Sequence, residues 1–234
     1  MKRIFTILMS LIICISIYSQ SFYVNKAKNE FVIEKTYITI GYNTEYNIPN
    51  YVGEKLVYSM TIGTEKREPG FYPETALPVE KQTRSRQYTG TGYDRGHLAP
   101  AADFKWNKKA MYESFSMANV APQWPSVNRG NWQQLEEQIR KYSKSVDTLY
   151  VITGTFVTNP NHCISDSIVV PTYFYKAIIG KKRNRYKVSC AWLFNNDISL
   201  VSKQMTINEL EKFIGRNLFY KKNNEKVEGK ILLP

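Results

Sequence analysis

The stretch YDRGHLAP, residues 93–100, combines residue types that suit chemistry on a phosphate group. Arg95 stands two residues before His97, and Gly96 between them lets the backbone approach a partner closely. A guanidinium can bind two phosphate oxygens at once, and an imidazole can accept a proton from water near neutral pH. The motif therefore predicts a phosphate site with His97 as base. Asp94 could orient this cluster, although a loop-capping aspartate is the simpler interpretation.

A second group of polar residues follows further along the chain. The segments NVAPQ and NRGNW begin at Asn119 and Asn128, and Glu136 falls about two turns into a helix that starts at Asn131. Asn128 could simply cap that helix or occupy a turn, but this leaves Asn119 and Glu136 unexplained. Mg²⁺ prefers oxygen ligands and keeps several waters, so one amide oxygen suits it. The spacing thus indicates a metal site, with Glu136 holding metal-bound water.

Together these blocks resemble the DNA/RNA non-specific endonucleases, a family that includes mitochondrial endonuclease G and secreted bacterial nucleases. The similarity runs from about Leu56 to Phe156 and rests on several blocks in the same order and at the same spacing. It implies an α+β fold with a ββα-metal (His-Me finger) site and a central, mostly antiparallel sheet flanked by helices. It also implies hydrolysis of DNA and RNA to 5′-phosphate ends with little sequence preference, because the site addresses phosphates and not base edges.

The resemblance implies a role for each matching residue. His97 would be the general base that activates the attacking water, Asn128 the direct protein ligand of the metal, and Glu136 a ligand of metal-bound water. The metal would be Mg²⁺, with Mn²⁺ possible. The chain departs from the family at Arg129 and Asn131, where other members often carry Gln and Ala, and an added phosphate contact is the expected consequence.

Three further residues receive catalytic roles from the same resemblance. Asn119 would hold His97 or the substrate in place, and Arg95 would contact phosphate or support the electrostatics of the site. Arg67 resembles the family's transition-state arginine, with Arg84 and Arg86 as rival candidates because the surrounding loop matches poorly.

The N-terminus has the layout of a secretory signal peptide. Lys2 and Arg3 precede an apolar run, residues 4–17, and small residues follow at a cleavage point after residue 19 or 20. An uncleaved anchor is the alternative, but the run is short for a bilayer span. We therefore predict a signal peptide over 1–20 and one endonuclease domain over 21–234. The protein would be secreted or periplasmic, without stable membrane association after cleavage.

Composition and charge narrow the class of protein. With 43% apolar and 22% charged residues the chain is globular, which excludes a disordered or fibrous protein. Its net charge of +12 favours a polyanionic partner, which could be nucleic acid, an acidic membrane surface or an acidic glycan. Cys163 and Cys190 could form a disulfide or remain buried free thiols. A homodimer is possible.

Residue patterns predict a mixture of strands and helices around a long loop over 64–93. The expected strands are 37–40, 56–62, 148–156, 168–179 and 186–194, and the expected helices are 108–116, 131–144 and one opened by a capping box from Thr206 to Glu209. Trp132 is expected in the core and Trp124 near the substrate. His162 and Cys163 are too few ligands for a closed zinc site.

Two other functions compete with the nuclease. A nucleic-acid-binding protein that kept only the fold would be expected to lack His97, Asn128 or Glu136, and all three are present. An adhesive envelope protein could use the basic charge on acidic glycans or lipids, and its binding would persist in chelator without cleavage.

Overall fold

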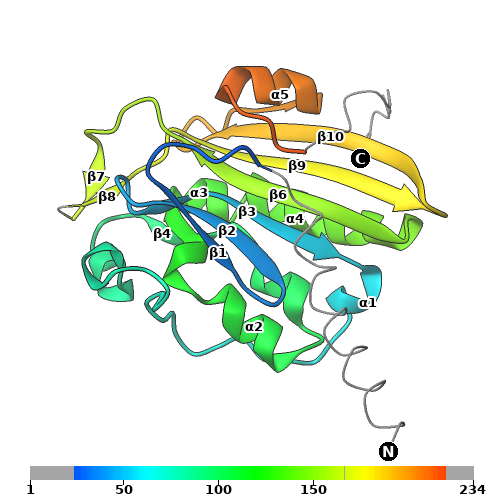
Figure 1. Ribbon diagram of the computed structural model, residues 1–234, viewed down its shortest axis with the longest axis horizontal. Helices are drawn as coiled ribbons and strands as arrows, with labels where there is room; N and C mark the ends of the chain where they lie inside the picture. The colour runs from blue at the N-terminus through cyan, green and yellow to red at the C-terminus, as the bar shows by residue number, and fades with distance from the viewer. Residues whose placement is uncertain (1–23, 166, 220–234) are drawn as a thin grey trace, which may run out of the picture.

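The computed structural model describes residues 24–165 and 167–219, so the predicted signal peptide lies outside the described residues (Figure 1). A seven-stranded sheet forms the frame, and every neighbouring pair in it is antiparallel. Its strands, in spatial order, are β1 (Glu30–Glu34), β2 (Ile38–Asn43), β3 (Ile48–Leu56), β6 (Thr148–Phe156), β9 (Tyr173–Lys182), β10 (Arg185–Asn195) and β11 (Ser202–Met205).

Both faces of this sheet are covered, as β9 makes clear. Phe174, Lys176 and Ile178 pack on one face, and the alternate residues between them pack on the other; all are buried. The sequence between β9 and β10 turns at Arg183 and Asn184, whose φ angles of 47° and 59° are the left-handed backbone conformation that a two-residue hairpin turn of this kind requires.

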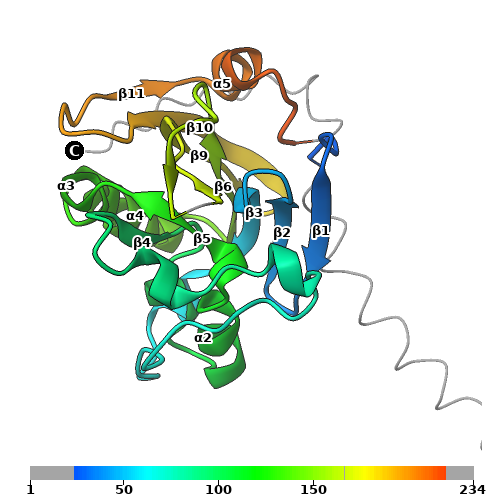
Figure 2. The same ribbon diagram turned by 90° about the vertical axis from the view of Figure 1, so that its left-hand side faces the viewer.

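The two covering layers differ in composition (Figure 2). One face carries α5 (Ile207–Ile214), which begins with the predicted capping box at Thr206 and ends at Gly215 with φ 67°. The other face carries α4 (Asn131–Tyr142), a separate ribbon of β4 (Asp94–His97) and β5 (Val120–Gln123), and α2 (Lys108–Ser114). Shorter elements complete the described chain: α1 (Tyr58–Thr61), α3 (Pro125–Asn128), β7 (Cys163–Ile164), β8 (Ile168–Val169), and 3₁₀ turns η1 (Val79–Lys81), η2 (Ser85–Tyr88), η3 (Ala101–Phe104), η4 (Met117–Asn119) and η5 (Ser143–Ser145).

The α+β class with a central antiparallel sheet flanked by helices is confirmed, but two strand predictions were wrong. The strand expected over 56–62 ends at Leu56, because its partner β6 begins at Thr148 and offers nothing to pair with beyond that point. Residues 58–61 form the helical turn α1 instead. The strand expected over 168–179 is interrupted around Pro171, which has no N–H to donate to a ladder.

The structure distinguishes the two alternatives for the cysteines and tests the described helices for a membrane span. Cys163 is exposed and Cys190 is buried, and no disulfide joins them, so the disulfide alternative does not hold and only Cys190 fits the alternative of a buried thiol. Within residues 24–165 and 167–219, no helix combines the length and apolar character needed to cross a bilayer.

Gly154 provides a stability test of the packed sheet. A Cβ at this position would lie 2.5 Å from the carbonyl oxygen of Asn50 and would also overlap the ring of Tyr175. We expect Gly154→Ala to lower the free energy of unfolding by about 1–3 kcal/mol, the usual cost of overpacking, in urea denaturation. Gly70→Ala is the matched control, because nothing lies within 4 Å of its added Cβ. Equal stability of the two variants would contradict this packing.

Candidate active site

The DRGH motif forms β4, which pairs with β5 so that Asp94 lies opposite Gln123 and His97 opposite Val120. Glycine is required at position 96, because a Cβ there would lie 2.6 Å from the Cβ of Gln123. The close pairing makes a short ribbon with Asp94 at one end and His97 at the other. The two ends of the motif therefore serve different parts of the site.

Asn119 fixes the chain just after His97. Its side chain is fully buried, donates to the carbonyls of Ala99 (2.9 Å) and Ser114 (2.8 Å), and accepts from the Ala99 N–H (2.9 Å). Its own carbonyl accepts the Leu98 N–H at 3.0 Å. Asn119 thus ties the segment after β4 to the end of α2. These bonds make it a support for the backbone that follows His97.

His97 lies in an apolar enclosure with one nearby cation. Its ring centroid is 5.0 Å from Phe71 and 5.1 Å from Phe115, and the Arg67 guanidinium lies over the Phe115 ring at 5.3 Å. Burial, and secondarily the charge of Arg67, lower the pKa of His97 to about 3. The imidazole is therefore neutral at physiological pH, and its buried Nε2 has no hydrogen-bond partner among the described residues.

The opposite end of β4 is organised by the Asp94 carboxylate. It accepts from Asn128 Nδ2 at 2.9 Å and receives two bonds from Arg129, from Nε at 2.8 Å and from NH2 at 2.5 Å. Partial burial raises the pKa of Asp94, but the hydrogen bonds from Arg129 and Asn128 more than offset this and lower it below its ordinary value. A loop-capping role for Asp94 is therefore wrong, and Arg129 binds this carboxylate in place of the expected phosphate contact.

This contact determines how Asn128 is oriented. A carboxylate can only accept hydrogen bonds, so the amide nitrogen of Asn128 must face Asp94 and its oxygen must point away. Asn128 ends α3, and Gly130 is the residue that precedes α4, so Asn128 is not that helix's cap. The outward amide oxygen is a hard donor of the kind that Mg²⁺ and Mn²⁺ prefer.

Glu136 lies on α4 within a buried group of charges. Burial raises its pKa to about 7; the Asp103 carboxylate adds to the rise, whereas the charges of Lys176 and Arg140 oppose it. Arg140, one turn further along α4, binds Asp103 at 2.9 Å. Lys176 donates from Nζ to the carbonyl of Leu98, the residue after His97, at 3.3 Å. This lysine therefore acts electrostatically on Glu136 and holds the His97 segment directly.

Lys176 itself is almost completely buried, with 1% of its surface exposed. It donates to Thr153 Oγ1 at 2.5 Å and lies 5.0 Å from the Trp132 ring, which confirms Trp132 in the core. Glu54 is buried nearby, and both its carboxylate oxygens lack hydrogen-bond partners among the described residues. Burial, with the neighbouring Asp103 charge, raises the pKa of Glu54 well above its ordinary value.

The four candidate arginines lie in three different places. Arg95 turns towards the preceding loop, donating to the Ser85 carbonyl at 2.6 Å and lying 5.6 Å from the Tyr88 ring. Arg84 and Arg86 are exposed at η2. Arg67 is the arginine whose charge acts on His97, which favours it as the cation of the site.

The donor set fits a metal that keeps most of its own water. Among residues 24–165 and 167–219 there is no group of three or more His, Cys, Asp or Glu side chains that could hold a metal ion. The chain instead offers the Asn128 amide oxygen and the Glu136 carboxylate, which suits a hydrated Mg²⁺ or Mn²⁺ and not a closed zinc site. His162 is exposed in the loop after β6, and Cys163 is exposed at the start of β7.

The motif residues have neighbours that local sequence pattern does not reveal. Phe71 and Phe115 enclose His97, and Lys176 and Arg140 balance Glu136. The one available signal is Lys176, a charged residue flanked by apolar and aromatic residues in the first part of β9. The pairing of Arg129 with Asp94 had no local signal.

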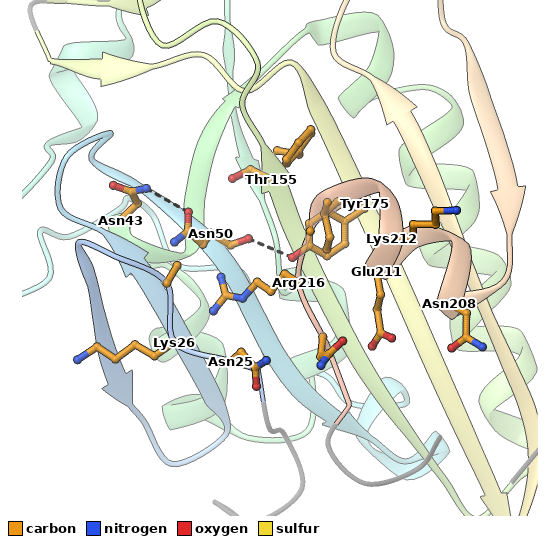
Figure 3. A pocket seen from close by; sticks show the side chains of 15 residues that line it. Asn25, Lys26, Asn43, Asn50, Thr155, Tyr175, Asn208, Glu211, Lys212 and Arg216 are labelled. Atoms are coloured by element: carbon orange, nitrogen blue, oxygen red, sulfur yellow. Dashed lines mark hydrogen bonds between the residues drawn. The ribbon is translucent and has the colours of Figure 1, made fainter. Parts of the chain in front are cut away.

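A polar cavity of about 610 Å³ lies elsewhere, beneath α5 on the other face of the sheet (Figure 3). Its polar groups are engaged with the protein itself: Tyr175 donates to the Asn50 carbonyl at 3.3 Å, and Arg216 binds Glu30 at 2.7 Å. The ribbon, α4 and Lys176 belong to the opposite layer, so this cavity is not the site formed by the motif.

Comparisons with known proteins show the family of the chain. Residues 19–226 match the family described as DNA/RNA non-specific endonuclease. The chain is 34% identical over 131 residues to mitochondrial endonuclease G of Homo sapiens, which covers 49% of this chain and 42% of that protein. It is 25% identical over 206 residues to the mitochondrial nuclease EXOG of Xenopus laevis, 80% of this chain and 58% of that protein. The chain thus spans about half the length of these two relatives.

Two further matches cover most of both partners. Nuclease C1 of Cunninghamella echinulata is 28% identical over 211 residues, 82% of this chain and 83% of that protein. A crystal structure of the EndoG/EndoGI complex, which addresses EndoG inhibition, matches with a TM-score of 0.70 at 23% identity. That alignment covers 79% of this chain and 84% of the other, and it shows that the fold is shared.

The enclosure of His97 predicts a pH effect on stability. Because the folded-state pKa is lowered from 6.5 to about 3, the neutral imidazole stabilises the fold above pH 6.5. This contribution is lost as the pH falls from 6.5 towards 3, since the unfolded chain takes up a proton that the folded chain does not. Between pH 7.5 and 4.5, we expect the wild type to lose about 2 kcal/mol more unfolding free energy than His97→Gln in urea titrations. Parallel losses would show that His97 is hydrated.

Proposed function

This chain belongs to the DNA/RNA non-specific endonuclease family, and from that premise we propose that it hydrolyses phosphodiester bonds in DNA and RNA. The observation that carries the proposal is the pair of groups at the two ends of β4. His97 is a neutral base in an apolar enclosure, and Asp94 turns the oxygen of Asn128, the last residue of α3, outward. A base on β4 and a hard-cation ligand oriented by β4 suit hydrolysis of a phosphodiester.

His97 would accept the proton of the attacking water. A base that is neutral at pH 7 can accept this proton, and the rings of Phe71 and Phe115 pack against the imidazole. The imidazolium formed would lie in an apolar setting, so the proton would be passed on readily. The Arg67 guanidinium, close enough to act on His97, would offset the negative charge that gathers on the phosphate.

The chain's oxygen donors indicate where a divalent ion would be held. Asn128 would bind it directly through Oδ1, and Glu136 would contact its water, while Asp94 keeps Asn128 in orientation. When bound, Mg²⁺ or Mn²⁺ would supply positive charge to the phosphate and to the departing 3′-oxygen. Departure of that oxygen leaves the phosphate on the 5′ end of the product.

Substrate range follows from the type of contact. The groups assigned here address phosphate and water, and none of them requires a 2′-hydroxyl or a base edge, so DNA and RNA should both be cut with little sequence preference. The net charge of +12 would attract either polyanion. We also propose export by the signal peptide over residues 1–20, to the periplasm or the medium.

Cleavage of supercoiled plasmid and of total RNA tests the proposal. With Mg²⁺, we expect the purified protein to digest both, and chelator to stop both reactions. His97→Ala should lose at least about 100-fold in rate, as expected when a general base is removed. Arg67→Gln should be strongly impaired, whereas its matched control Arg84→Gln, exposed at η2, should not.

Two outcomes would contradict this account. Full activity of His97→Ala would remove His97 as the base. A protein that retards plasmid on a gel, yet cuts nothing with any divalent metal, would be a nucleic-acid-binding protein that retains the nuclease fold.

A further inference from the structure

Three ring-bearing side chains gather beside the Asp94–Asn128 contact. The Tyr93 ring centroid lies 5.6 Å from that of Trp124, with the rings edge to face. It lies 6.0 Å from the His162 ring, and the Tyr93 hydroxyl is 3.3 Å from His162 Nε2. Tyr93 and Trp124 are half-buried and His162 is exposed, so the cluster reaches the surface. None of the three has a part in the hydrolytic chemistry proposed above.

The chain connects this cluster directly to the residues of the site. Tyr93 immediately precedes Asp94, whose carboxylate holds Asn128 at 2.9 Å. Trp124 immediately precedes α3, and its carbonyl accepts the Asn128 N–H at 2.9 Å. Both rings are therefore attached to the backbone that positions Asn128. A nucleotide whose phosphate lies at Asn128 would have its base within reach of this cluster.

The cluster is also firmly supported. The Trp124 N–H donates to Asn196 Oδ1 at 2.7 Å, and the buried Asn196 amide donates to the carbonyls of Pro122 and Pro171 at 3.0 and 2.9 Å. The carbonyl of His162 accepts the Val170 N–H at 2.8 Å, which anchors its loop to the main body. The rings are thus held in place before any ligand binds, which lowers the cost of binding.

We propose that Tyr93, Trp124 and His162 form a subsite for an unpaired nucleobase of the nucleotide next to the cleaved phosphate. The proposal rests on the proposed nuclease function and adds a contact with the base to a site otherwise directed at phosphate. Aromatic faces stack with any base, so the subsite strengthens binding without selecting sequence. A base held in a duplex cannot reach it without leaving the helix, so the contact favours single-stranded or locally opened substrate.

The test uses single-stranded oligonucleotides with one natural phosphodiester and phosphorothioate linkages elsewhere. A base is removed from one nucleotide at a time on either side of the natural bond, and kcat/KM is measured with Mg²⁺. For the wild type, we expect base removal at one adjacent position to lower kcat/KM at least about fivefold, the lower end of what stacking contributes. Removal at distant positions should have no effect.

Variants then assign the loss to the cluster. In Tyr93→Leu and His162→Ala, the complete oligonucleotide should already be cut more slowly, and base removal should cost little more. Tyr93→Phe keeps the ring and should keep most of the sensitivity to base removal. Tyr186→Leu is the matched control. Tyr186 is an aromatic residue at the start of β10, where it pairs with Lys181 beside the β9–β10 turn, and this variant should behave as wild type. Because His162 is exposed, His162→Ala remains informative if Tyr93→Leu fails to fold.

The two levels of the proposal fail in different ways. If the wild type cuts the oligonucleotide but no single base removal slows it, or if the variants keep the full wild-type sensitivity, the subsite is overturned and the nuclease function stands. If the wild type cuts neither this oligonucleotide nor plasmid with any divalent metal, the nuclease function itself is overturned, and the subsite with it.

Discussion

The site depends on one carboxylate that accepts hydrogen bonds from two neighbouring residues. Asp94 binds the amide nitrogen of Asn128 and the guanidinium of Arg129, and a carboxylate admits only donors. The Asn128 amide nitrogen must face the carboxylate, so the Asn128 oxygen is directed away from β4. Removing the Asp94 carboxylate would leave the Asn128 amide free to rotate, so Asp94 sets the orientation of the proposed metal ligand.

The other end of β4 is held by the sheet in a different way. Asn119 binds the backbone of Ala99, and the buried Lys176 reaches from β9 to the carbonyl of Leu98. The Lys176 charge also opposes the rise in the pKa of Glu136. A single cation therefore acts on both the His97 segment and Glu136 of α4. A buried lysine is costly unless its charge is compensated, and the charges of Asp103 and Glu136 act within the same buried group. The raised pKa of Glu54 favours its neutral form, so this carboxyl does not add to the compensation.

The sequence predicted the parts of the structure that depend on local pattern. The DRGH motif, the capping box at Thr206 and the core position of Trp132 follow from residue types at fixed spacing. What could not be predicted depends on partners far along the chain. Arg129 was expected to meet phosphate, yet the packing of α3 against β4 brings it to Asp94. Residues 58–61 were expected in a strand, but β3 ends at Leu56, because its antiparallel partner β6 begins at Thr148 and has no residues to pair with 58–61.

The most direct test of the central claim is calorimetric titration of Mn²⁺ into Asp94→Ala in the absence of nucleic acid. If Asp94 orients Asn128, the variant should bind Mn²⁺ about tenfold more weakly than the wild type, in the range found when the residue that orients a metal ligand is removed. Asp147→Ala, which removes an exposed carboxylate that accepts the Arg183 N–H, is the control and should bind as the wild type does. Equal Mn²⁺ affinity of Asp94→Ala and wild type, with the fold intact by circular dichroism, would contradict the account.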